Sequence, residues 1–402
     1  MQENSGAFSI APAPGPGGGP GAVRSIGGVS RAGLQRRMAG AWRATRREPA
    51  PALRVTADRL ATSQSGRVEA AVSEALERVR PPGAQIAVRR RGTLLWAACA
   101  GRSDRSAPVL PEDRFVIASS TKLATACLVA QLAERGVLGL DDPVATWLPE
   151  LPHAGRLTPR LLLAHRSGLR EYLKDGALAP RFNGGAPDHP WTRGEVIAAI
   201  ARLGSEREPD KRFRYRNSNY VVAAELAERA SGQDYETLLQ TQIAGPLGLP
   251  GFSSARSIPG TRLATPHLGL FRRPVDLLAV TRGRVPTDAL GSVWGDGGIA
   301  SSALDLARFT EALFGGELVS ARTLRAMTAR ASRFGRKGGY GLGVMTTRVG
   351  GAVVAGHDGV YFGWTASTGI DDATATTVSA VANLTAPSVP AARLAKAARA
   401  AL

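Results

Sequence analysis

Lysine is scarce in this 402-residue chain, which has only five lysines beside 46 arginines. The formal net charge is +18, a value typical of proteins that bind nucleic acids or anionic surfaces. Of that excess, +6 comes from residues 1–55, which hold eight arginines and two acidic residues. Elsewhere the arginines are scattered among acids, and aromatic residues make up only 5% of the chain. We therefore interpret the charge as a preference for arginine and expect no nucleic-acid partner.

The chain also lacks a cysteine framework, a histidine cluster and long apolar runs. Its two cysteines, Cys99 and Cys127, lie in apolar stretches, which favours buried thiols over disulfides. The five histidines show no metal-ligand spacing, so we expect neither a metal nor another cofactor. No run approaches the roughly 20 apolar residues of a transmembrane helix.

Residues 1–56 differ in composition from the rest of the chain. Proline, glycine and alanine fill residues 11–21, an arginine-rich stretch follows, and we expect the whole segment to be disordered. It contains no signal-peptide pattern, which predicts a cytoplasmic protein as the sequence is written. A secreted or periplasmic protein stays open if translation starts elsewhere, for example at Met38. Folding is expected to begin near Ala57, with residues 57–402 forming one domain.

Strand patterns occur at both ends of this domain and helical patterns lie between them. The expected elements are a helix at 65–80, strand pairs at 84–101 and 360–384, a mainly helical segment from Ser119 to Leu249, and a closing helix at 389–402. The simplest architecture is a mixed α/β (α+β) fold. One antiparallel sheet is built from both chain ends and flanked by helices, and the helical segment forms an inserted lobe. Ligands usually bind in clefts between such lobes.

A serine and one of the rare lysines, Ser119 and Lys122, open the helical segment. Residues three apart share one helix face, so we expect their side chains to be neighbours. A lysine held out of water loses its proton more easily, and it can then activate a serine nucleophile as a base. The alternative is a serine that merely caps an ordinary helix. The spacing alone leaves both interpretations open.

Two further groups could complete a site. Tyr215 and Asn217 alternate in what we expect to be a strained loop, so both could face one cleft. Tyr215 could act as a general acid or base if cations lower its pKa. Asn217 could hold a substrate carbonyl or orient the lysine. The alternative is a buried tyrosine capped by asparagine.

The third group is His357-Asp358-Gly359, followed by Val360. The His-x-Gly pattern recurs elsewhere in the chain, so only its place after the other two groups favours it. We expect His357 to open a strand whose glycine lets a backbone N–H approach a reacting carbonyl closely. The N–H groups of Ser119 and Val360 would then form an oxyanion hole.

In this order, Ser-x-x-Lys, Tyr-x-Asn and His-x-Gly resemble the serine β-lactamase and penicillin-binding-protein superfamily. The resemblance is to its class C-like branch, which includes D-alanyl-D-alanine carboxypeptidases, D-aminopeptidases and esterases. It extends over roughly residues 66–385, including the supporting stretches 157–169, 245–249, 295–309 and 340–344. It implies a β-lactamase-like fold in which residues 57–402 form a serine hydrolase domain.

The resemblance also implies an acyl-enzyme mechanism. Ser119 attacks a carbonyl, and Lys122 and Tyr215 share the base role. Asn217 binds the acyl side chain, while His357 favours a substrate carboxylate or relays protons. The implied activity is that of a D-alanyl-D-alanine carboxypeptidase-like peptidase. A β-lactamase-like carboxylesterase, a D-aminopeptidase and a weak β-lactamase are alternatives, and a catalytically silent binding scaffold is an alternative of another class.

The implied partner is a small molecule or peptide with a hydrolysable acyl bond, and the oligomeric state stays open.

Two departures from the family pattern narrow the range of implied activities. Arg216 stands where a small residue is more familiar, and we expect its side chain to point away from the cleft. A histidine at position 357, in place of lysine, weakens the fixed positive charge at neutral pH.

His165 and Ser167 could be mistaken for a catalytic pair. We interpret them as a structural loop because no third orienting group is identifiable.

Overall fold

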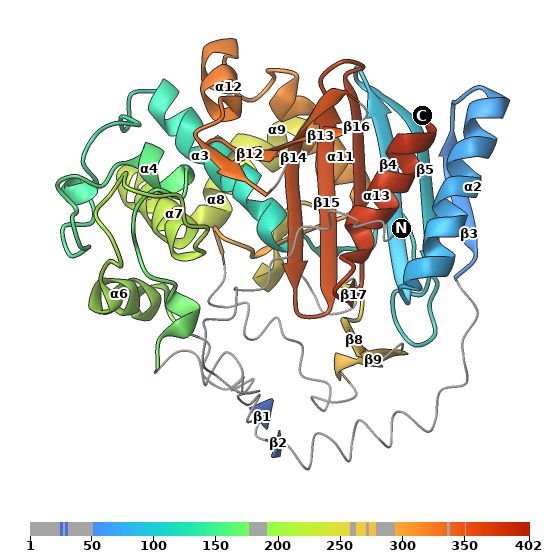
Figure 1. The fold of residues 1–402 in the computed structure, drawn as a ribbon, viewed down its shortest axis with the longest axis horizontal. Helices are drawn as coiled ribbons and strands as arrows, with labels where there is room; N and C mark the ends of the chain where they lie inside the picture. Colours follow the sequence, from blue (N-terminus) through green and yellow to red (C-terminus); the bar gives the residue numbers. More distant parts are fainter. Residues whose placement is uncertain are drawn as a thin grey trace, which may run out of the picture.

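The computed structural model describes residues 51–176, 191–257, 263–270, 273–278, 294–335, 338–349 and 351–402, together with the short strands β1 (Ser25–Ile26) and β2 (Val29–Ser30). Its main feature is a nine-stranded sheet in which every neighbouring pair is antiparallel (Figure 1). In spatial order the strands are β11 (Ser332–Phe334), β12 (Gly338–Tyr340), β13 (Met345–Val349), β14 (Ala352–Tyr361), β15 (Trp364–Asp371), β16 (Thr376–Ala382), β4 (Gly83–Arg90), β5 (Thr93–Gly101) and β3 (Leu53–Asp58).

The sheet joins the two ends of the domain, as the sequence predicted. β16 pairs with β4, so the last strands of the chain lie directly beside the first ones. The predicted strand pair at 84–101 is confirmed as β4 and β5, joined through Arg91 and Gly92, which both have positive φ (47° and 81°), as a type I′ hairpin turn requires. The strand pair near the C-terminus is confirmed as β15 and β16.

The sheet begins earlier than expected. β3 pairs with β5 and starts at Leu53, four residues before Ala57, where we expected folding to begin. The expected disorder of residues 1–56 concerns segments that lie mostly outside the described residues. None of the helices in the described ranges has the length and apolarity needed to cross a bilayer.

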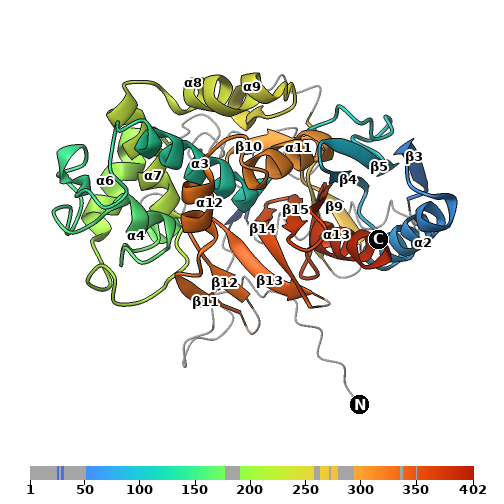
Figure 2. The same cartoon turned by 90° about the horizontal axis from the view of Figure 1, so that it is seen from above.

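Helices cover both faces of the sheet (Figure 2). The predicted terminal helices are confirmed as α2 (Thr62–Val79) and α13 (Pro390–Ala401), which pack together on one face. They bury Val72 and Leu394 against sheet residues such as Ile86. Helix α11 (Ala303–Phe314) contacts β4, β15 and β16 and belongs to the larger core on the other face. The central strands β4, β15 and β16 are therefore buried along most of their length, because apolar layers cover both faces of the sheet.

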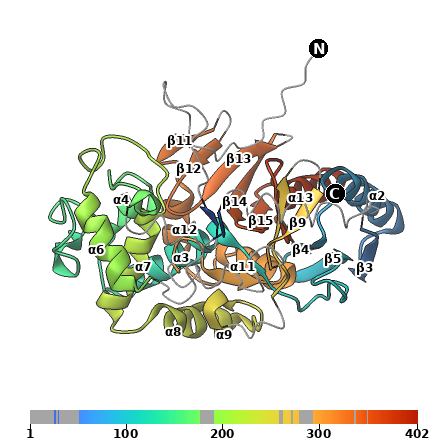
Figure 3. The ribbon, with the colours of Figure 1, turned by 90° about the horizontal axis from the view of Figure 1, so that it is seen from below.

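The inserted lobe lies beyond α3 (Thr121–Glu134), on the side away from α2 (Figure 3). α3 contacts β14 as well as the lobe, and residues 121–132 are all buried. Because α3 is covered on all sides, it has no face of charged, solvent-exposed residues along this stretch. The other main helices of this region are α4 (Pro159–Leu163), α6 (Arg193–Leu203), α7 (Ser218–Ser231), α8 (Tyr235–Leu239) and α12 (Ala321–Thr328).

Both cysteines are buried and free. Burial raises the pKa of the Cys99 thiol to about 11, and burial also raises the pKa of Cys127. Cys99 and Cys127 are therefore small core residues, as predicted, and their thiols stay protonated at neutral pH.

Candidate active site

Ser119 lies in η1 (Ala118–Ser120), a short 3₁₀ turn that leads into α3. The turn is fixed from both sides. Ile117 N–H donates to the Ile299 carbonyl at 2.9 Å, and Ser120 Oγ donates to the His357 carbonyl at 3.1 Å. Ala118 has φ of 50°, a conformation that costs an L-residue about 1–2 kcal/mol. Backbone strain of this kind is concentrated at functional sites, and here it sets the position of Ser119.

Lys122 is fully buried, and its Nζ contacts three acceptors, two of them from distant parts of the chain. Nζ lies 3.0 Å from Ser119 Oγ, 2.9 Å from Asn217 Oδ1 and 2.6 Å from the Asp296 carbonyl oxygen. Burial lowers the pKa of Lys122 to about 8, against the opposing effect of Asp296 and Glu171. A neutral amine still donates to Asn217 and Asp296, and its lone pair is then available to the Ser119 hydroxyl. The arrangement suits proton removal from Ser119.

Tyr215 lies beside this pair, with its ring centre 5.1 Å from Lys122 Nζ. From the sequence, its acid or base role depended on nearby cations lowering its pKa. In the structure, burial raises the pKa of Tyr215 well above its ordinary value, although the Ser119 side chain acts in the opposite direction. Its hydroxyl has no hydrogen bond of ordinary geometry within the described residues. Tyr215 is therefore a protonated phenol, suited to donating a proton rather than removing one.

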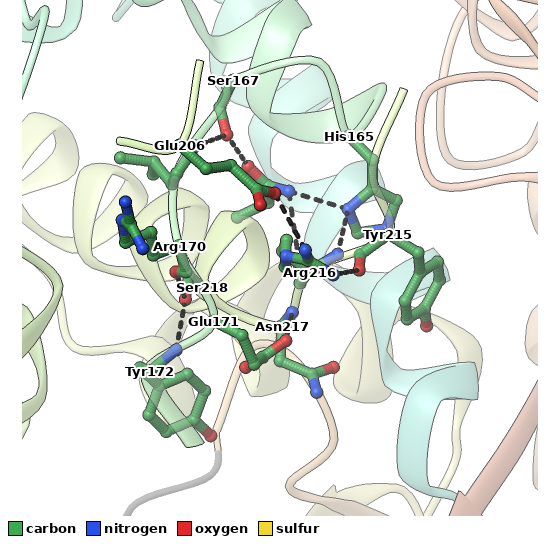
Figure 4. Close-up of polar contacts among 12 residues, drawn as sticks. His165, Ser167, Arg170, Glu171, Tyr172, Glu206, Tyr215, Arg216, Asn217 and Ser218 are labelled. Carbon is green, nitrogen blue, oxygen red and sulfur yellow. Dashed lines mark hydrogen bonds and ion pairs between the residues drawn. The ribbon is translucent and has the colours of Figure 1, made fainter. Parts of the chain in front are cut away.

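Asn217 orients the lysine. Its side-chain oxygen accepts from Lys122, and its backbone N–H donates to Glu171 Oε2 at 2.8 Å. It does not lie in a strained loop as we expected, because it has φ of −64° and directly precedes α7. Arg216 pairs with Glu206 at 2.8 Å. Figure 4 shows the side chains of Arg216 and Tyr215 pointing in different directions, as the sequence predicted.

His357 is buried in the middle of β14 rather than at the start of a strand. Its Nδ1 lies 2.6 Å from the Asp358 carbonyl oxygen, and its Nε2 lies 3.2 Å from Tyr340 Oη. Because a carbonyl can only accept, Nδ1 carries the proton and Nε2 accepts from the tyrosine. Burial and then Lys122 lower the pKa of His357 to about 3. The ring is neutral at physiological pH, so the expectation that it attracts a substrate carboxylate is not supported.

Gly359 lets β14 approach the Ser119 turn. β14 pairs with β13 only as far as Gly356, and the following residues lie against η1. A Cβ atom at Gly359 would fall 2.0 Å from the Ile117 carbonyl oxygen, a distance that no side chain could keep. The close backbone approach expected at this glycine is present. The pairing of the Ser119 and Val360 N–H groups as an oxyanion hole stays a prediction.

Two buried carboxyl groups near Lys122 escaped the sequence analysis. Burial raises the pKa of Asp296 to about 7 and also raises the pKa of Glu171, and Lys122 opposes both shifts. Asp296 Oδ2 accepts from the Tyr172 hydroxyl at 3.1 Å, while Oδ1 has no partner within the described residues. Asp296 lies in the stretch 295–309, which carried part of the resemblance. Glu171 gave no signal, because a lone glutamate in a loop resembles any surface residue.

His165 and Ser167 do not form a pair. Ser167 Oγ contacts Asn219 Oδ1, and His165 Nδ1 lies 2.9 Å from Asn219 Nδ2. Both residues therefore belong to a packed loop, in agreement with our interpretation. Among the described residues, no group of three or more His, Cys, Asp or Glu side chains is arranged to hold a metal ion.

A family model described as Beta-lactamase matches residues 68–402. The chain belongs to the beta-lactamase family. It is 33% identical to esterase EstB of Burkholderia gladioli over 52% of this chain and 55% of EstB. It is 29% identical to a D-aminopeptidase of Brucella anthropi over 70% of this chain and 52% of that protein. The chain thus spans about half the length of these relatives.

The fold agrees with this membership of the beta-lactamase family. The D-amino acid amidase of Ochrobactrum anthropi, solved in complex with L-phenylalanine amide, aligns with a TM-score of 0.72 and 24% identity. The alignment covers 84% of this chain and 99% of the amidase. The predicted β-lactamase-like architecture is confirmed.

Proposed function

We propose that the chain hydrolyses amide and ester bonds through a covalent acyl-enzyme on Ser119, with Lys122 as the general base. The observation that carries this proposal is the 3.0 Å separation of Lys122 Nζ from Ser119 Oγ in a fully buried setting. The neutral amine takes the hydroxyl proton as Oγ bonds to the substrate carbonyl carbon. The negative charge that develops on the carbonyl oxygen is stabilised by the N–H groups of Ser119 and Val360.

The leaving group departs with a proton from Tyr215, which burial keeps in its phenol form. The Lys122 ammonium, lying over the tyrosine ring, then restores the phenol proton. Water attacks the acyl-enzyme next and loses its proton to the lysine, which passes that proton to Ser119 Oγ as the acyl bond breaks and the acid is released. Asn217 holds the amine in position throughout, because its side-chain oxygen is already a partner of Nζ.

The charges around the site favour one class of substrate. Glu171 and Asp296 place two carboxyl groups near Lys122, whereas His357 is neutral and offers no charge to a substrate carboxylate. We therefore propose acyl donors with a free amine beside the scissile carbonyl, D-amino-acid amides and esters first. The names of the D-aminopeptidase and esterase relatives support this choice. A D-alanyl-D-alanine peptide would instead bring an unpaired carboxylate to the site.

Turnover on four substrates tests this choice. We expect kcat/KM for D-alanine p-nitroanilide to exceed that for an N-acetylated D-Ala-D-Ala peptide at least tenfold, with p-nitrophenyl butyrate hydrolysed and nitrocefin poor. Glu171→Gln keeps an acceptor for the Asn217 N–H but removes the charge. A charged hydrogen bond contributes about 1.5–3 kcal/mol, so this variant should lose about 10–100-fold on the anilide. Its rate on the butyrate ester should stay within about threefold; equal losses on both substrates would contradict amine recognition by Glu171.

The pH profile tests the base. Since the lysine must be neutral to act, kcat/KM should rise as the pH increases through about 8, the pKa of Lys122. The Asp296 carboxylate stabilises the charged ammonium, so Asp296→Asn should move this rise to lower pH. Initial rates from pH 5 to 10 give both profiles. A rise centred near pH 6.5 that Asp296→Asn leaves in place would point to an ordinary histidine instead.

A further inference from the structure

The loop of His165 lies directly against the segment that carries Tyr215, and its role is not explained by the mechanism above. We propose that His165 is a positioning residue that holds the Tyr215 phenol toward Ser119. This inference rests on the proposed role of Tyr215 as the proton donor. It extends that proposal, because it assigns a function to a buried histidine that takes no part in the steps above.

His165 fixes the backbone on both sides of Tyr215. Its carbonyl oxygen accepts from the Arg214 N–H at 2.8 Å, and its Nδ1 accepts from the Arg216 N–H at 3.4 Å. Figure 4 shows the imidazole beside this segment, with a dashed line to each of its partners. His165 thus holds the backbone N–H groups of the two residues on either side of Tyr215, one with its carbonyl oxygen and the other with its side chain. Rotation of the Tyr215 backbone would break at least one of these bonds.

The ring of His165 also fixes the ring of Tyr215. The two ring centres are 4.3 Å apart at an interplanar angle of 39°. Tyr220 and Tyr340 lie on other sides of the imidazole, at 5.0 and 4.9 Å, and His165 is only 1% exposed. In a core packed to this density, a tilt of the imidazole displaces the phenol with it.

His165 does not itself transfer a proton. Nδ1 faces two donors, the Arg216 N–H and Asn219 Nδ2, so it is the acceptor nitrogen and the proton is on Nε2. Nε2 has no hydrogen-bond partner within the described residues. Burial lowers the pKa of His165 well below its ordinary value, so the ring keeps this neutral form. His165 supplies a fixed acceptor for the Arg216 N–H, and it affects the rate by holding Tyr215 in place.

The backbone of the loop supports the same conclusion. His165 has φ of 55°, in the left-handed region that only about a few per cent of non-glycine residues adopt, chiefly Asn, Asp and His. Two further bonds join the loop to the segment that leads to Tyr215, from Asp210 N–H to the Arg166 carbonyl at 2.8 Å and from Glu206 N–H to the Gly168 carbonyl at 2.9 Å. The side chain of His165 bonds to the Arg216 N–H, directly after Tyr215. Strain is retained where the side chain at that position has a task.

Two substitutions separate the acceptor from the bulk of the ring. His165→Leu fills a similar volume without an acceptor, whereas His165→Asn places an amide oxygen near the Nδ1 position and tolerates the positive φ. On D-alanine p-nitroanilide we expect His165→Leu to lower kcat 30–100-fold with KM within threefold. His165→Asn should stay within about fivefold of the wild type. Thermal unfolding of each variant is measured in parallel. If His165→Leu fails to fold, the asparagine variant decides: a loss above 30-fold in a folded His165→Asn protein overturns the proposal.

A double-mutant cycle with Tyr215→Phe tests whether the effect passes through the phenol. In the phenylalanine background, His165→Leu should lower kcat by less than threefold. A loss as large as in the wild-type background would show that His165 acts elsewhere and overturn the positioning role. If Tyr215→Phe alone leaves kcat within threefold of wild type, the proposed donor role of Tyr215 fails, and the positioning role fails with it. An undiminished effect of His165→Leu in the phenylalanine background rejects only the positioning role and leaves the Ser119–Lys122 chemistry in place. An active Tyr215→Phe variant rejects the donor role of Tyr215 as well, so the two failures are distinguishable.

Discussion

Lys122→Met is expected to lower kcat/KM by about four orders of magnitude, the upper range for loss of a general base. Without the neutral amine, the Ser119 hydroxyl keeps its proton and stays a weak nucleophile. Methionine is unbranched and similar in length, so it fills the buried space without a large cavity. The Asn217 side-chain oxygen and the Asp296 carbonyl lose their shared donor, which costs about 1–3 kcal/mol for each unsatisfied acceptor.

Lys396→Met is the matched control, because Lys396 is exposed on α13 and has the same side chain. It should leave kcat/KM within twofold of wild type. Steady-state hydrolysis of D-alanine p-nitroanilide, with thermal unfolding to confirm that each variant is folded, gives the comparison. A folded Lys122→Met protein with turnover within threefold of wild type would exclude Lys122 as the base.

Gly359→Ala is expected to have the second-largest effect, a loss of about 100- to 1000-fold in kcat/KM. The new Cβ would meet the Ile117 carbonyl oxygen at 2.0 Å and the Ala118 Cβ at 3.2 Å. β14 must therefore move away from η1 by about 1 Å or more to restore ordinary contact, and a misplacement of 1 Å can cost about 100-fold. Removal of an oxyanion-hole donor costs about 100- to 1000-fold in rate. Displacement of the Val360 N–H alone would therefore account for the largest loss in kcat/KM expected here.

Gly66→Ala controls for the general effect of replacing glycine. Gly66 lies within α2, and a Cβ there would have nothing within 4 Å. Alanine should stabilise this helix by roughly 0.5–1 kcal/mol and leave activity unchanged. Turnover and thermal unfolding of both variants are compared with wild type. Wild-type activity in Gly359→Ala would show that the approach of β14 to Ser119 is not required.

The elements at the chain ends could be predicted because their signals are local. The Arg91-Gly92 turn, the apolar face of α2 and the strand pair before α13 each lie within a few neighbouring residues. Ser119 and Lys122 were predicted for the same reason, because their contact spans one turn. The start of β3 at Leu53 was missed since an edge strand next to an arginine-rich segment has no distinctive pattern.

The electrostatic properties of the site could not be predicted in this way. The pKa of Tyr215 is raised because burial outweighs the opposing effect of the Ser119 side chain. His357 is neutral because burial, and then Lys122, lower its pKa to about 3. Glu171 and Asp296 approach Lys122 only after three separate loops pack together. Each effect depends on burial, which arises from contacts between residues far apart in the sequence.

The most direct measurement is the site of covalent labelling by a fluorophosphonate, read by mass spectrometry. Trypsin cuts after Arg114 and Lys122, so residues 115–122 form one peptide that holds Ser119 and Ser120. We predict one adduct per chain, located on Ser119 by fragmentation, with a labelling rate that rises with pH through about 8. Ser119→Ala should take up no label. An unlabelled wild-type protein, or an adduct on any residue other than Ser119, would contradict the account.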